Sequence, residues 1–367
     1  MTGSRLSNID RSFWRGRRVL LTGHTGFKGA WAALLLSRLG AEVHGLSLSP
    51  EEPSLFSAAR VAEMCASSSF VDLRDREATH ASVVACQPQV VLHFAAQSLV
   101  RRAFLDPVET FSSNVMGTVH LLEALRHIDR LQTVLVTTTD KVYYNAETGE
   151  PFREGDRLGG VEAYGASKTA VEHVVAAYRA SYFAAKGVAV LVARAGNVIG
   201  GGDWSQDRIL PDIVRACECG RPLDVRNPGA VRPWQHVLEA LEGYLMLVER
   251  KGQDEQTSGA DPENNAWNFG PPMAAEMVTV AQICDWAAQA WPERFRWRHT
   301  PDASGVKESN LLLLDPSRAM AELGWRPRLG PVDALQITLG WYKSVEAGQD
   351  PRQACLVDMA CLGLATP

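Results

Sequence analysis

The sequence predicts an α/β protein with a doubly wound parallel sheet of the Rossmann type and a smaller, discontinuous C-terminal lobe for substrate binding. Three observations predict this fold class. Short apolar runs alternate with stretches of helical periodicity over about the first two hundred residues. A glycine-rich turn joins the first apolar run to the first helical stretch. After Arg194 the chain becomes rich in glycine and proline, as expected of loops that carry specificity on a rigid scaffold.

Each expected strand is a short apolar run, because a strand covered by helices on both faces has no polar side. Strands are expected at 18–22, 42–48, a run ending at 71–73, 90–94, 133–137 and 188–194. Helices are expected at 29–39, about 106–128 and 163–185, and helical patterning resumes from about 316. The polar, acidic segment 251–265 is expected to be an exposed loop. This alternation builds a parallel sheet with helices on both faces.

The composition is that of a globular protein and excludes several classes of function. The 367 residues are 46% hydrophobic and 22% charged, and the net charge of −5 comes from 37 basic and 42 acidic side chains. No basic surplus exists to neutralise a nucleic-acid backbone, so no nucleic-acid partner is expected. No run of about 18 apolar residues occurs, so no membrane span or membrane partner is expected.

The cysteines indicate a reducing compartment. Seven cysteines are scattered along the chain, which gives neither a disulfide framework nor the paired spacing of a zinc site. Cys217 and Cys219 form the one close pair, and no second ligand pair lies near them in the sequence. We therefore expect reduced thiols, a cytoplasmic protein and no bound metal.

The segment Thr22 to Gly29 predicts a dinucleotide-binding turn. It places Gly23, Gly26 and Gly29 three residues apart, directly after an expected strand and at the start of an expected helix. Glycine permits the tight turn, the close approach of backbone N–H groups to a pyrophosphate, and close packing of helix on sheet. The helix N-terminus adds about half a positive charge toward the phosphates.

The second strand lacks the carboxylate that usually holds the adenosine ribose of NAD. Its end carries Ser47 and Ser49, which would bond a hydroxyl only weakly, and no arginine follows to bind the 2′-phosphate of NADP. The sequence therefore leaves the choice between NAD and NADP open at this position. Asp72, after the third strand, is placed to contact an adenine amino group, with a turn-forming aspartate as the alternative.

Tyr164 and Lys168 form a candidate catalytic pair. They are four residues apart in an expected helix, so both side chains lie on one helix face. A nearby ammonium favours the phenolate and is expected to lower the pKa of tyrosine from its usual value of about 10. Tyr164 is therefore a candidate base near neutral pH.

Three further segments carry a resemblance to a known family. They are 138–143 (TTDKVY), 194–204 (RAGNVIGGGDW) and 231–237 (VRPWQHV). Together with the glycine turn and the Tyr-Lys pair, they identify the chain as resembling the extended short-chain dehydrogenase/reductase family over nearly its whole length. Within that family the chain is similar to the nucleotide-sugar 4,6-dehydratases. Most of these carry glutamate where this chain has Lys141, and the lysine variant is similar to the members that act on CDP-glucose.

The resemblance implies an activity and assigns five catalytic roles. The activity is the dehydration of CDP-D-glucose to CDP-4-keto-6-deoxy-D-glucose in deoxysugar and O-antigen biosynthesis, with NAD regenerated in each turnover. Tyr164 takes the proton from O4 while a hydride leaves C4, and Lys168 holds the ribose and lowers the pKa of the tyrosine. Asp140 protonates the leaving C6 hydroxyl, Lys141 occupies the position of the C5 base, and Thr139 hydrogen-bonds O4.

The resemblance also implies the binding residues and the domains. For NAD these are Gly23, Thr25, Gly26, Phe27, Gly29, Asp72, Leu73, Phe94, Ala95, Ala96, Thr137, Tyr164 and Lys168. For the nucleotide sugar they are Gln97, Asn197, Arg208 and Arg232, of which the arginines suit a diphosphate through bidentate contacts. The NAD-binding domain is expected to comprise residues 12–195 and about 234–268, and the nucleotide-sugar lobe about 196–233 and 269–360.

Several alternatives stay open at this point. Lys141 acts as a base only when it is neutral, so a structural salt bridge with Asp140 is the alternative to catalysis. A nucleotide-sugar 4-epimerase would share Tyr164 and Lys168 but has no C6 hydroxyl to expel. A 4,6-dehydratase for another nucleotide sugar would keep all these residues. A catalytically silent, NAD-sensing protein on the same fold is an alternative of a different class.

The resemblance also bears on assembly and on two buried polar residues. Members of the family pair two long helices per subunit into a four-helix bundle, so a homodimer or homotetramer is expected. The expected helices at about 106–128 and 163–185 are long enough for this. His93 is expected to be a core histidine, and Asn114 is expected to stabilise the helix that carries the site.

Overall fold

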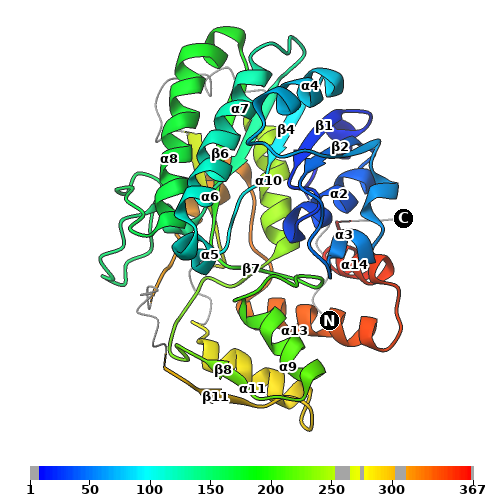
Figure 1. Ribbon diagram of the computed structural model, residues 1–367, viewed down its shortest axis with the longest axis vertical. Helices are drawn as coiled ribbons and strands as arrows, with labels where there is room; N and C mark the ends of the chain where they lie inside the picture. The colour runs from blue at the N-terminus through cyan, green and yellow to red at the C-terminus, as the bar shows by residue number, and fades with distance from the viewer. Residues whose placement is uncertain (1–7, 253–264, 273–276, 302–310, 365–367) are drawn as a thin grey trace.

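The computed structural model describes residues 8–252, 265–272, 277–301 and 311–364 (Figure 1). Within these residues the largest sheet has seven parallel strands in the order β10-β6-β5-β4-β1-β2-β3. Its strands are β1 (Arg18–Thr22), β2 (Glu42–Ser47), β3 (Ser67–Phe70), β4 (Val90–His93), β5 (Thr133–Thr137), β6 (Ala189–Ala195) and β10 (Ala266–Phe269). The predicted doubly wound sheet is confirmed.

The strand order creates a switch point between β1 and β4. The chain runs outward from β1 through β2 to β3, then returns to β4 and continues to the opposite edge. Ligands of such sheets bind outside the carboxyl ends of the strands at this point. The strand predicted to end at 71–73 stops at Phe70, because β3 is a serine-rich edge strand without the apolar run that would mark it.

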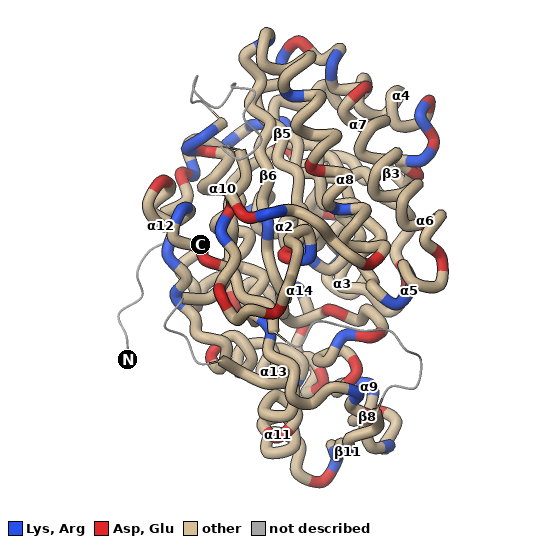
Figure 2. The backbone as a smooth tube through the Cα atoms, turned by 90° about the vertical axis from the view of Figure 1, so that its left-hand side faces the viewer, with Lys and Arg blue, Asp and Glu red and all other residues tan. Residues whose placement is uncertain are grey.

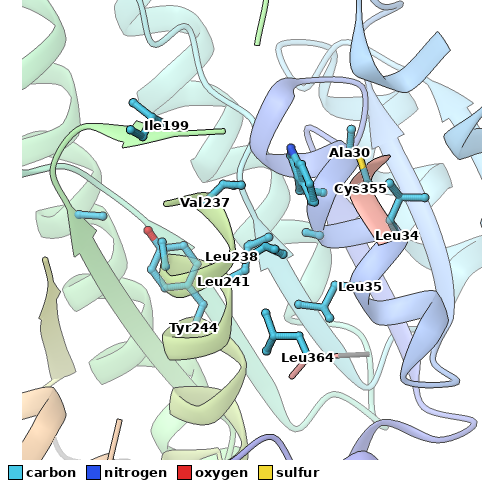
Figure 3. Close-up of a cluster of buried hydrophobic side chains, with 14 of the residues drawn as sticks. Ala30, Leu34, Leu35, Ile199, Val237, Leu238, Leu241, Tyr244, Cys355 and Leu364 are labelled. Carbon is cyan, nitrogen blue, oxygen red and sulfur yellow. The ribbon is translucent and has the colours of Figure 1, made fainter. Parts of the chain in front are cut away.

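Helices cover both faces of the sheet. One face carries α4 (Arg76–Cys86), α7 (Gly117–Leu125) and α8 (Ala163–Tyr178), whose apolar side chains form one core cluster with the strands. The other carries α2 (Phe27–Arg38) and α10 (Val237–Lys251), which belong to the larger cluster. Figure 3 shows part of that cluster. Both helices pack closely, which fixes the glycine turn at the start of α2 beside the second lobe.

The two long predicted helices are present, but each contains a wide turn that the periodicity did not predict. The first consists of α6 (Pro107–Phe111), the π-helical turn η2 (Ser112–Met116) and α7. The second continues from α8 into the π-helical turn η4 (Arg179–Phe183) and the 3-10 turn η5 (Ala184–Lys186). Such turns are common at functional sites, and η2 lies against the helix that carries Tyr164.

The second lobe lies below the sheet in Figure 1. It is built from the two-stranded pairs β7–β9 and β8–β11 and from α9, α11 and α13. Their bounds are β7 (Val198–Ile199), β8 (Leu223–Val225), β9 (Gln235–His236), β11 (Trp297–His299), α9 (Ile209–Cys219), α11 (Val280–Ala290) and α13 (Pro331–Glu346). The remaining elements are α1 (Arg11–Trp14), α3 (Leu55–Ala58), η1 (Val61–Met64), α5 (Val100–Leu105), η3 (Asp140–Val142), α12 (Ser317–Leu323) and α14 (Pro351–Cys361).

Two chain segments join the lobe to the sheet layer. The strand β10 follows α10 in the chain and pairs with β6, so the edge of the sheet is completed by residues distant in sequence. Helix α14 contacts α13 of the lobe and also α3, where Arg352 donates from Nε to the carbonyl oxygen of Ala59 at 2.7 Å. Most of the loop predicted at 251–265 lies outside the described residues, while Lys251 ends α10 and Asn265 is buried.

The distribution of charge, the cysteines and the helices can each be compared with what the composition led us to expect. Figure 2 shows acidic and basic residues interspersed along the backbone. All seven cysteines lie in the described part of the chain, and none of them forms a disulfide. Among the residues that the structure describes, no helix combines the length and apolar character needed to cross a membrane.

Candidate active site

The glycine turn between β1 and α2 has the close packing that a phosphate-binding turn requires. Gly23 has a φ of +76°, and a Cβ atom there would lie 2.7 Å from the backbone nitrogen of Ala95. A Cβ atom on Gly29 would lie 2.0 Å from the carbonyl oxygen of Gly23. Gly26 is the N-cap of α2 and provides no side-chain acceptor, which leaves the first helical N–H groups for an anion. The turn fits the pyrophosphate of a dinucleotide.

The end of β2 is closed by hydroxyl contacts instead of a carboxylate. The hydroxyl oxygens of Thr25 and Ser47 are 2.7 Å apart, and the Thr25 hydroxyl lies 3.0 Å from the carbonyl oxygen of Leu48. Asp72 accepts from Nε of Arg74 at 2.8 Å, and this hydrogen bond holds the pKa of Asp72 below its usual value. Asp72 also accepts from the backbone N–H of Arg74, so it has the turn-forming arrangement that the sequence offered as the alternative.

The other residues predicted to contact the cofactor meet at the carboxyl edge of the sheet. Residues 94–96 directly follow β4, and Thr137 ends β5, where its hydroxyl donates to the carbonyl oxygen of His93 at 3.2 Å. Phe27 begins α2 and Leu73 follows β3. The structure thus brings the predicted set to the carboxyl edge of the sheet, on both sides of the switch point.

Tyr164 and Lys168 lie on the buried face of α8, as predicted. The exposed fraction is 8% for Tyr164 and 4% for Lys168. Glu162 caps the helix by accepting from the backbone N–H of Tyr164 at 2.7 Å, so the tyrosine is held in its first turn. The Thr139 side chain lies beside the Tyr164 phenol and acts to lower its pKa. Tyrosine and threonine therefore present two hydroxyl groups at one point of the site.

The predicted effect of Lys168 on the tyrosine was wrong for this structure. Burial raises the pKa of Tyr164 to about 12, and the neighbouring Thr139 side chain opposes this shift without reversing it. Lys168 donates from Nζ to the carbonyl oxygen of Thr137 at 3.0 Å, and burial lowers its pKa to about 8. Both groups lose water in the interior, and desolvation disfavours the charged form of each.

The turn after β5 joins an acid and an amine. Asp140 is fully buried, and its Oδ1 atom receives hydrogen bonds from the Thr139 hydroxyl at 3.0 Å and from Lys141 Nζ at 3.2 Å. The side chain of Lys141 is 30% exposed. The salt bridge that the sequence left as an alternative is therefore present. It occupies only one oxygen, because Oδ2 of Asp140 has no hydrogen-bond partner among the described residues.

The second lobe brings Asn197 and Arg232 toward this turn. A Cβ atom on Gly196 would lie 3.0 Å from Oδ2 of Asp140 and 2.3 Å from Cγ of Pro233, so these three residues are in close contact. Asn197 and Arg232 are their direct neighbours in the chain. The Arg232 guanidinium donates to the carbonyl oxygen of Val231 at 2.9 Å.

Arg208 reaches the site from the start of α9. Its guanidinium donates to Oδ2 of Asp203 at 2.9 Å and to the Ser98 hydroxyl at 3.1 Å. Its charge acts on the pKa of Tyr164, which places it near the phenol. Gln97 behaves differently: its amide donates to Thr110 and accepts from the backbone N–H of Leu99 at 2.6 Å. The side chain that we predicted to bind substrate is thus engaged by its own loop and by Thr110 of α6.

Buried polar atoms without partners mark the ligand-binding part of the site. Within the described residues these include Oδ2 of Asp140, Oδ1 of Asn197 and both amide atoms of Gln235. Gln235 is 2% exposed, and its backbone N–H donates to the carbonyl oxygen of Asn197 at 3.0 Å. Buried groups of this kind are normally satisfied, so a polar ligand or water is required beside them.

Sequence reasoning missed Gln235 and Lys28. Lys28 lies inside the glycine turn, and its Nζ donates to the Tyr244 hydroxyl at 3.3 Å. Burial, together with the positive charges of Arg208 and Lys168, lowers its pKa to about 7. The signal in the sequence was a basic residue between Gly26 and Gly29, where the backbone alone is needed for phosphate binding. For Gln235 the signal was its position in the segment 231–237, which carries part of the family resemblance.

The structural interpretations of His93 and Asn114 are confirmed. His93 is buried between the hydroxyls of Thr22 and Thr118, at 2.7 and 2.9 Å from its two ring nitrogens, and burial lowers its pKa to about 3. Asn114, in the π-helical turn η2, donates to the Ser167 hydroxyl of α8 at 2.9 Å. Asn114 therefore supports the helix that carries Tyr164.

Comparison with known proteins agrees with this geometry. The chain is 41% identical to a CDP-glucose 4,6-dehydratase of Salmonella typhimurium, over 93% of this chain and 95% of that protein. Its fold is similar to that of a Thermus thermophilus UDP-glucose 4-epimerase in complex with NAD, with 26% identity, a TM-score of 0.73 and coverage of 89% and 99%. It is also similar to the fold of a Bacillus anthracis dTDP-glucose 4,6-dehydratase in complex with NAD, with 20% identity, a TM-score of 0.73 and coverage of 92% and 100%.

A family model completes the assignment. The model described as GDP-mannose 4,6-dehydratase matches residues 20–337, which include the glycine turn, the turn 139–141, the Tyr-Lys pair and most of the second lobe. The chain therefore belongs to the GDP-mannose 4,6-dehydratase family, the nucleotide-sugar dehydratases of the extended short-chain dehydrogenase/reductases.

Proposed function

We propose that this protein catalyses the NAD-dependent dehydration of CDP-D-glucose to CDP-4-keto-6-deoxy-D-glucose. The observation that carries the proposal is the meeting of the Asp140–Lys141 pair with Tyr164 and Thr139 at one buried site. The 41% identity to a CDP-glucose 4,6-dehydratase supports the same reaction and the same nucleotide. An epimerase would also use Tyr164, but it expels no water and therefore needs neither the acid of Asp140 nor the amine of Lys141.

NAD fits the glycine turn, and when bound it accepts the hydride from C4 and later returns it to C6. The protein supplies the proton transfers. Tyr164 takes the proton from O4 as C4 is oxidised, and the Thr139 hydroxyl holds O4 in reach. Burial favours the neutral phenol, so Tyr164 must first release its own proton to water, a loss that Thr139 and Arg208 favour, before it can take the proton from O4.

The Asp140–Lys141 contact provides both groups needed for the loss of water. Moving one proton across the 3.2 Å contact from Nζ to the carboxylate converts the ion pair into a neutral amine and a carboxylic acid. The C5 proton is acidic once C4 is a carbonyl, and the Lys141 amine takes it. Asp140 gives its proton to the departing C6 hydroxyl, which leaves as water. The pair then returns to its charged form.

The second lobe supplies the contacts for the nucleotide sugar. Arg208 and Arg232 would grip the diphosphate, since guanidinium groups match phosphate oxygens. Asn197 has an unpartnered, buried Oδ1 atom that would accept from a sugar hydroxyl. In this proposal residues 12–195 and about 234–268 hold NAD, and residues about 196–233 and 269–360 hold the nucleotide sugar.

The assembly that we propose is a homodimer or homotetramer. Helices α5 and α6 and the turn η2 expose a row of apolar side chains: Phe104, Leu105, Val108, Phe111 and Met116. Leu105 and Val108 are 83% and 77% exposed, which is costly for a protein that stays monomeric. A second copy of the same helices would cover this row in a symmetric contact.

The cellular setting is also part of the proposal. The seven unpaired cysteines support a cytoplasmic enzyme, because disulfides are rare in that compartment. The product, a 4-keto-6-deoxy sugar nucleotide, would feed deoxysugar biosynthesis, including O-antigen assembly.

The test is mass spectrometry of products after incubation with NAD and, in parallel, CDP-glucose, dTDP-glucose, UDP-glucose and GDP-mannose. Loss of one water from CDP-glucose alone is expected. Loss of water from a different nucleotide sugar would retain the mechanism and change the substrate. Isomerisation without loss of water would favour a 4-epimerase, and no reaction with any of the four would favour a silent NAD-sensing protein.

A further inference from the structure

A buried ion pair lies directly behind the catalytic turn. The guanidinium of Arg194, at the end of β6, donates to both carboxylate oxygens of Glu172 on α8, with Nε 2.9 Å from Oε1 and Nη2 2.5 Å from Oε2. The side chains are 3% and 7% exposed. Two buried charges are unfavourable unless all their hydrogen-bonding groups have partners. The remaining donors and acceptors of this pair must therefore bond to other residues.

The same pair holds the residues on both sides of the catalytic turn. Thr138, directly before Thr139, donates from its hydroxyl to Oε1 of Glu172 at 2.7 Å. Tyr143, directly after the turn η3, accepts at its hydroxyl from Nη1 of Arg194 at 2.8 Å. The turn that carries Thr139, Asp140 and Lys141 is therefore fastened at its start by the carboxylate and at its end by the guanidinium.

The pair is itself anchored in rigid structure. The Tyr143 hydroxyl donates to Oδ1 of Asn268 in β10 at 2.8 Å, and the Tyr143 ring stacks on Phe152 with a centroid distance of 4.8 Å. Arg194 also donates to the carbonyl oxygen of Glu154 at 3.0 Å. These contacts connect the turn to α8, β6 and β10, which belong to different parts of the chain.

We propose that the Arg194–Glu172 pair, with Thr138 and Tyr143, is a clamp that positions the catalytic turn for the loss of water. The inference rests on the proposed function. Oxidation at C4 depends mainly on Tyr164, which is fixed by α8 itself, and the turn contributes only Thr139 to that step. Proton transfer at C5 and C6 depends on Asp140 and Lys141, which both lie on the turn. A looser clamp should therefore slow the loss of water more than the oxidation. Thr138 and Tyr143 are positioning residues in this view and need not touch the substrate.

The test uses two variants that each remove one hydroxyl of the clamp. Thr138→Val and Tyr143→Phe keep the shape of the side chain and delete the bond to Glu172 or Arg194. We expect kcat to fall by about 10-fold to 100-fold with little change in KM, because small displacements of catalytic groups have effects of this size. Reduced nicotinamide should accumulate in the first turnover, since oxidation proceeds while the loss of water is delayed.

Two controls separate the clamp from general loss of packing. Thr138→Ser keeps the hydroxyl and should restore most of the activity lost in Thr138→Val. Tyr178→Phe removes a tyrosine hydroxyl that donates to Glu123 at 3.2 Å near the far end of the same helix, and it should leave kcat unchanged. Hydrogen exchange of the backbone amides at 139–143 should become faster in the two clamp variants and stay unchanged in Tyr178→Phe.

The outcomes distinguish the two proposals. If the unaltered protein does not dehydrate any nucleotide sugar, the proposed function fails and the exchange measurement alone judges the clamp. If it does, unchanged kcat in both clamp variants, or equal slowing of oxidation and water loss, overturns the inference. Unchanged exchange at the turn would overturn it as well.

Discussion

Tyr164 has a high pKa in a site that needs it to accept a proton. Burial raises its pKa to about 12, so near neutral pH the phenol is mostly protonated and must lose its own proton before it can accept the proton of O4. Thr139 and the charge of Arg208 act in the opposite direction and favour the phenolate. The pKa of Tyr164 is thus set by burial, Thr139 and Arg208 more than by Lys168, whose Nζ donates to a backbone carbonyl oxygen.

Tyr164→Phe should abolish turnover while leaving the fold and cofactor binding intact. The phenylalanine ring fills the same space, and the loss of a general acid–base group costs about 10²-fold to 10⁴-fold in kcat. The measurement is the rate of product formation with CDP-glucose, together with binding of NAD by calorimetry as the control. Full activity in this variant would remove the assigned mechanism.

Arg232→Ala should raise the KM for the nucleotide sugar by about 10-fold or more, because a charged hydrogen-bond partner of the diphosphate is lost. The side chain is partly exposed, so the melting temperature should change little. Steady-state kinetics and thermal unfolding test the two expectations. An unchanged KM would return Arg232 to the structural role of a loop residue.

At the scale of elements, the packing of helices can bury a carboxylate in a position where its charge is unfavourable. Helix α14 closes over α3 and α13, and in doing so it buries Asp358, whose Oδ2 atom has no partner in the described part of the chain. Burial raises the pKa of Asp358 to about 7. Because the folded state binds this proton more tightly than the unfolded state, stability is greatest below pH about 4 for this group and is lost as pH rises toward 7.

Asp358→Asn should therefore stabilise the protein at pH 8 by about 1–3 kcal/mol, because it removes a buried, unpaired carboxylate. The gain should shrink as pH falls through 7 and disappear near pH 4, where the aspartate of the unaltered protein is protonated in both states. Denaturant unfolding at several pH values measures this. Asp350→Asn is the matched control on the same helix: Asp350 bonds Arg60 at the surface, so this change should not stabilise at any pH.

At the scale of the whole molecule, the sheet layer and the second lobe meet at the site, and the apolar row on α5, α6 and η2 is exposed. The sheet layer presents the glycine turn and the catalytic turn, and the second lobe presents Asn197, Arg208 and Arg232. The apolar row on α5, α6 and η2 lies on helices adjoining α8, so assembly there would stiffen the helix that carries Tyr164.

Leu105→Asp combined with Val108→Asp should lower the oligomeric state, because charges in an apolar contact remain unpaired when it forms. Both side chains are exposed, so the fold of each subunit should be retained. Light scattering after size-exclusion chromatography measures the mass of the assembly. Val357→Asp, at another exposed apolar residue on α14, is the control and should leave the mass unchanged. The same mass for all three proteins would contradict the proposed interface.

The sequence by itself determined the parallel sheet, the glycine turn and the placement of Tyr164 and Lys168 on one helix face. Each depends on a local pattern: an apolar run, a glycine spacing, or a separation of four residues along a helix. The end of strand β3 was predicted at 71–73 and lies at Phe70, because its residues are serines at an exposed edge. The π-helical turns were not predicted because they interrupt a periodicity that continues on both sides.

Only the tertiary structure decided how the site works. It placed Lys141 on Asp140 and left Oδ2 of that aspartate open, and it fastened Thr138 and Tyr143 to one buried ion pair. It also reversed the expected direction of the tyrosine pKa. These results have one physical reason. Burial and contacts between distant segments depend on which elements pack together, so a local pattern of residues does not show which side chains lose contact with water.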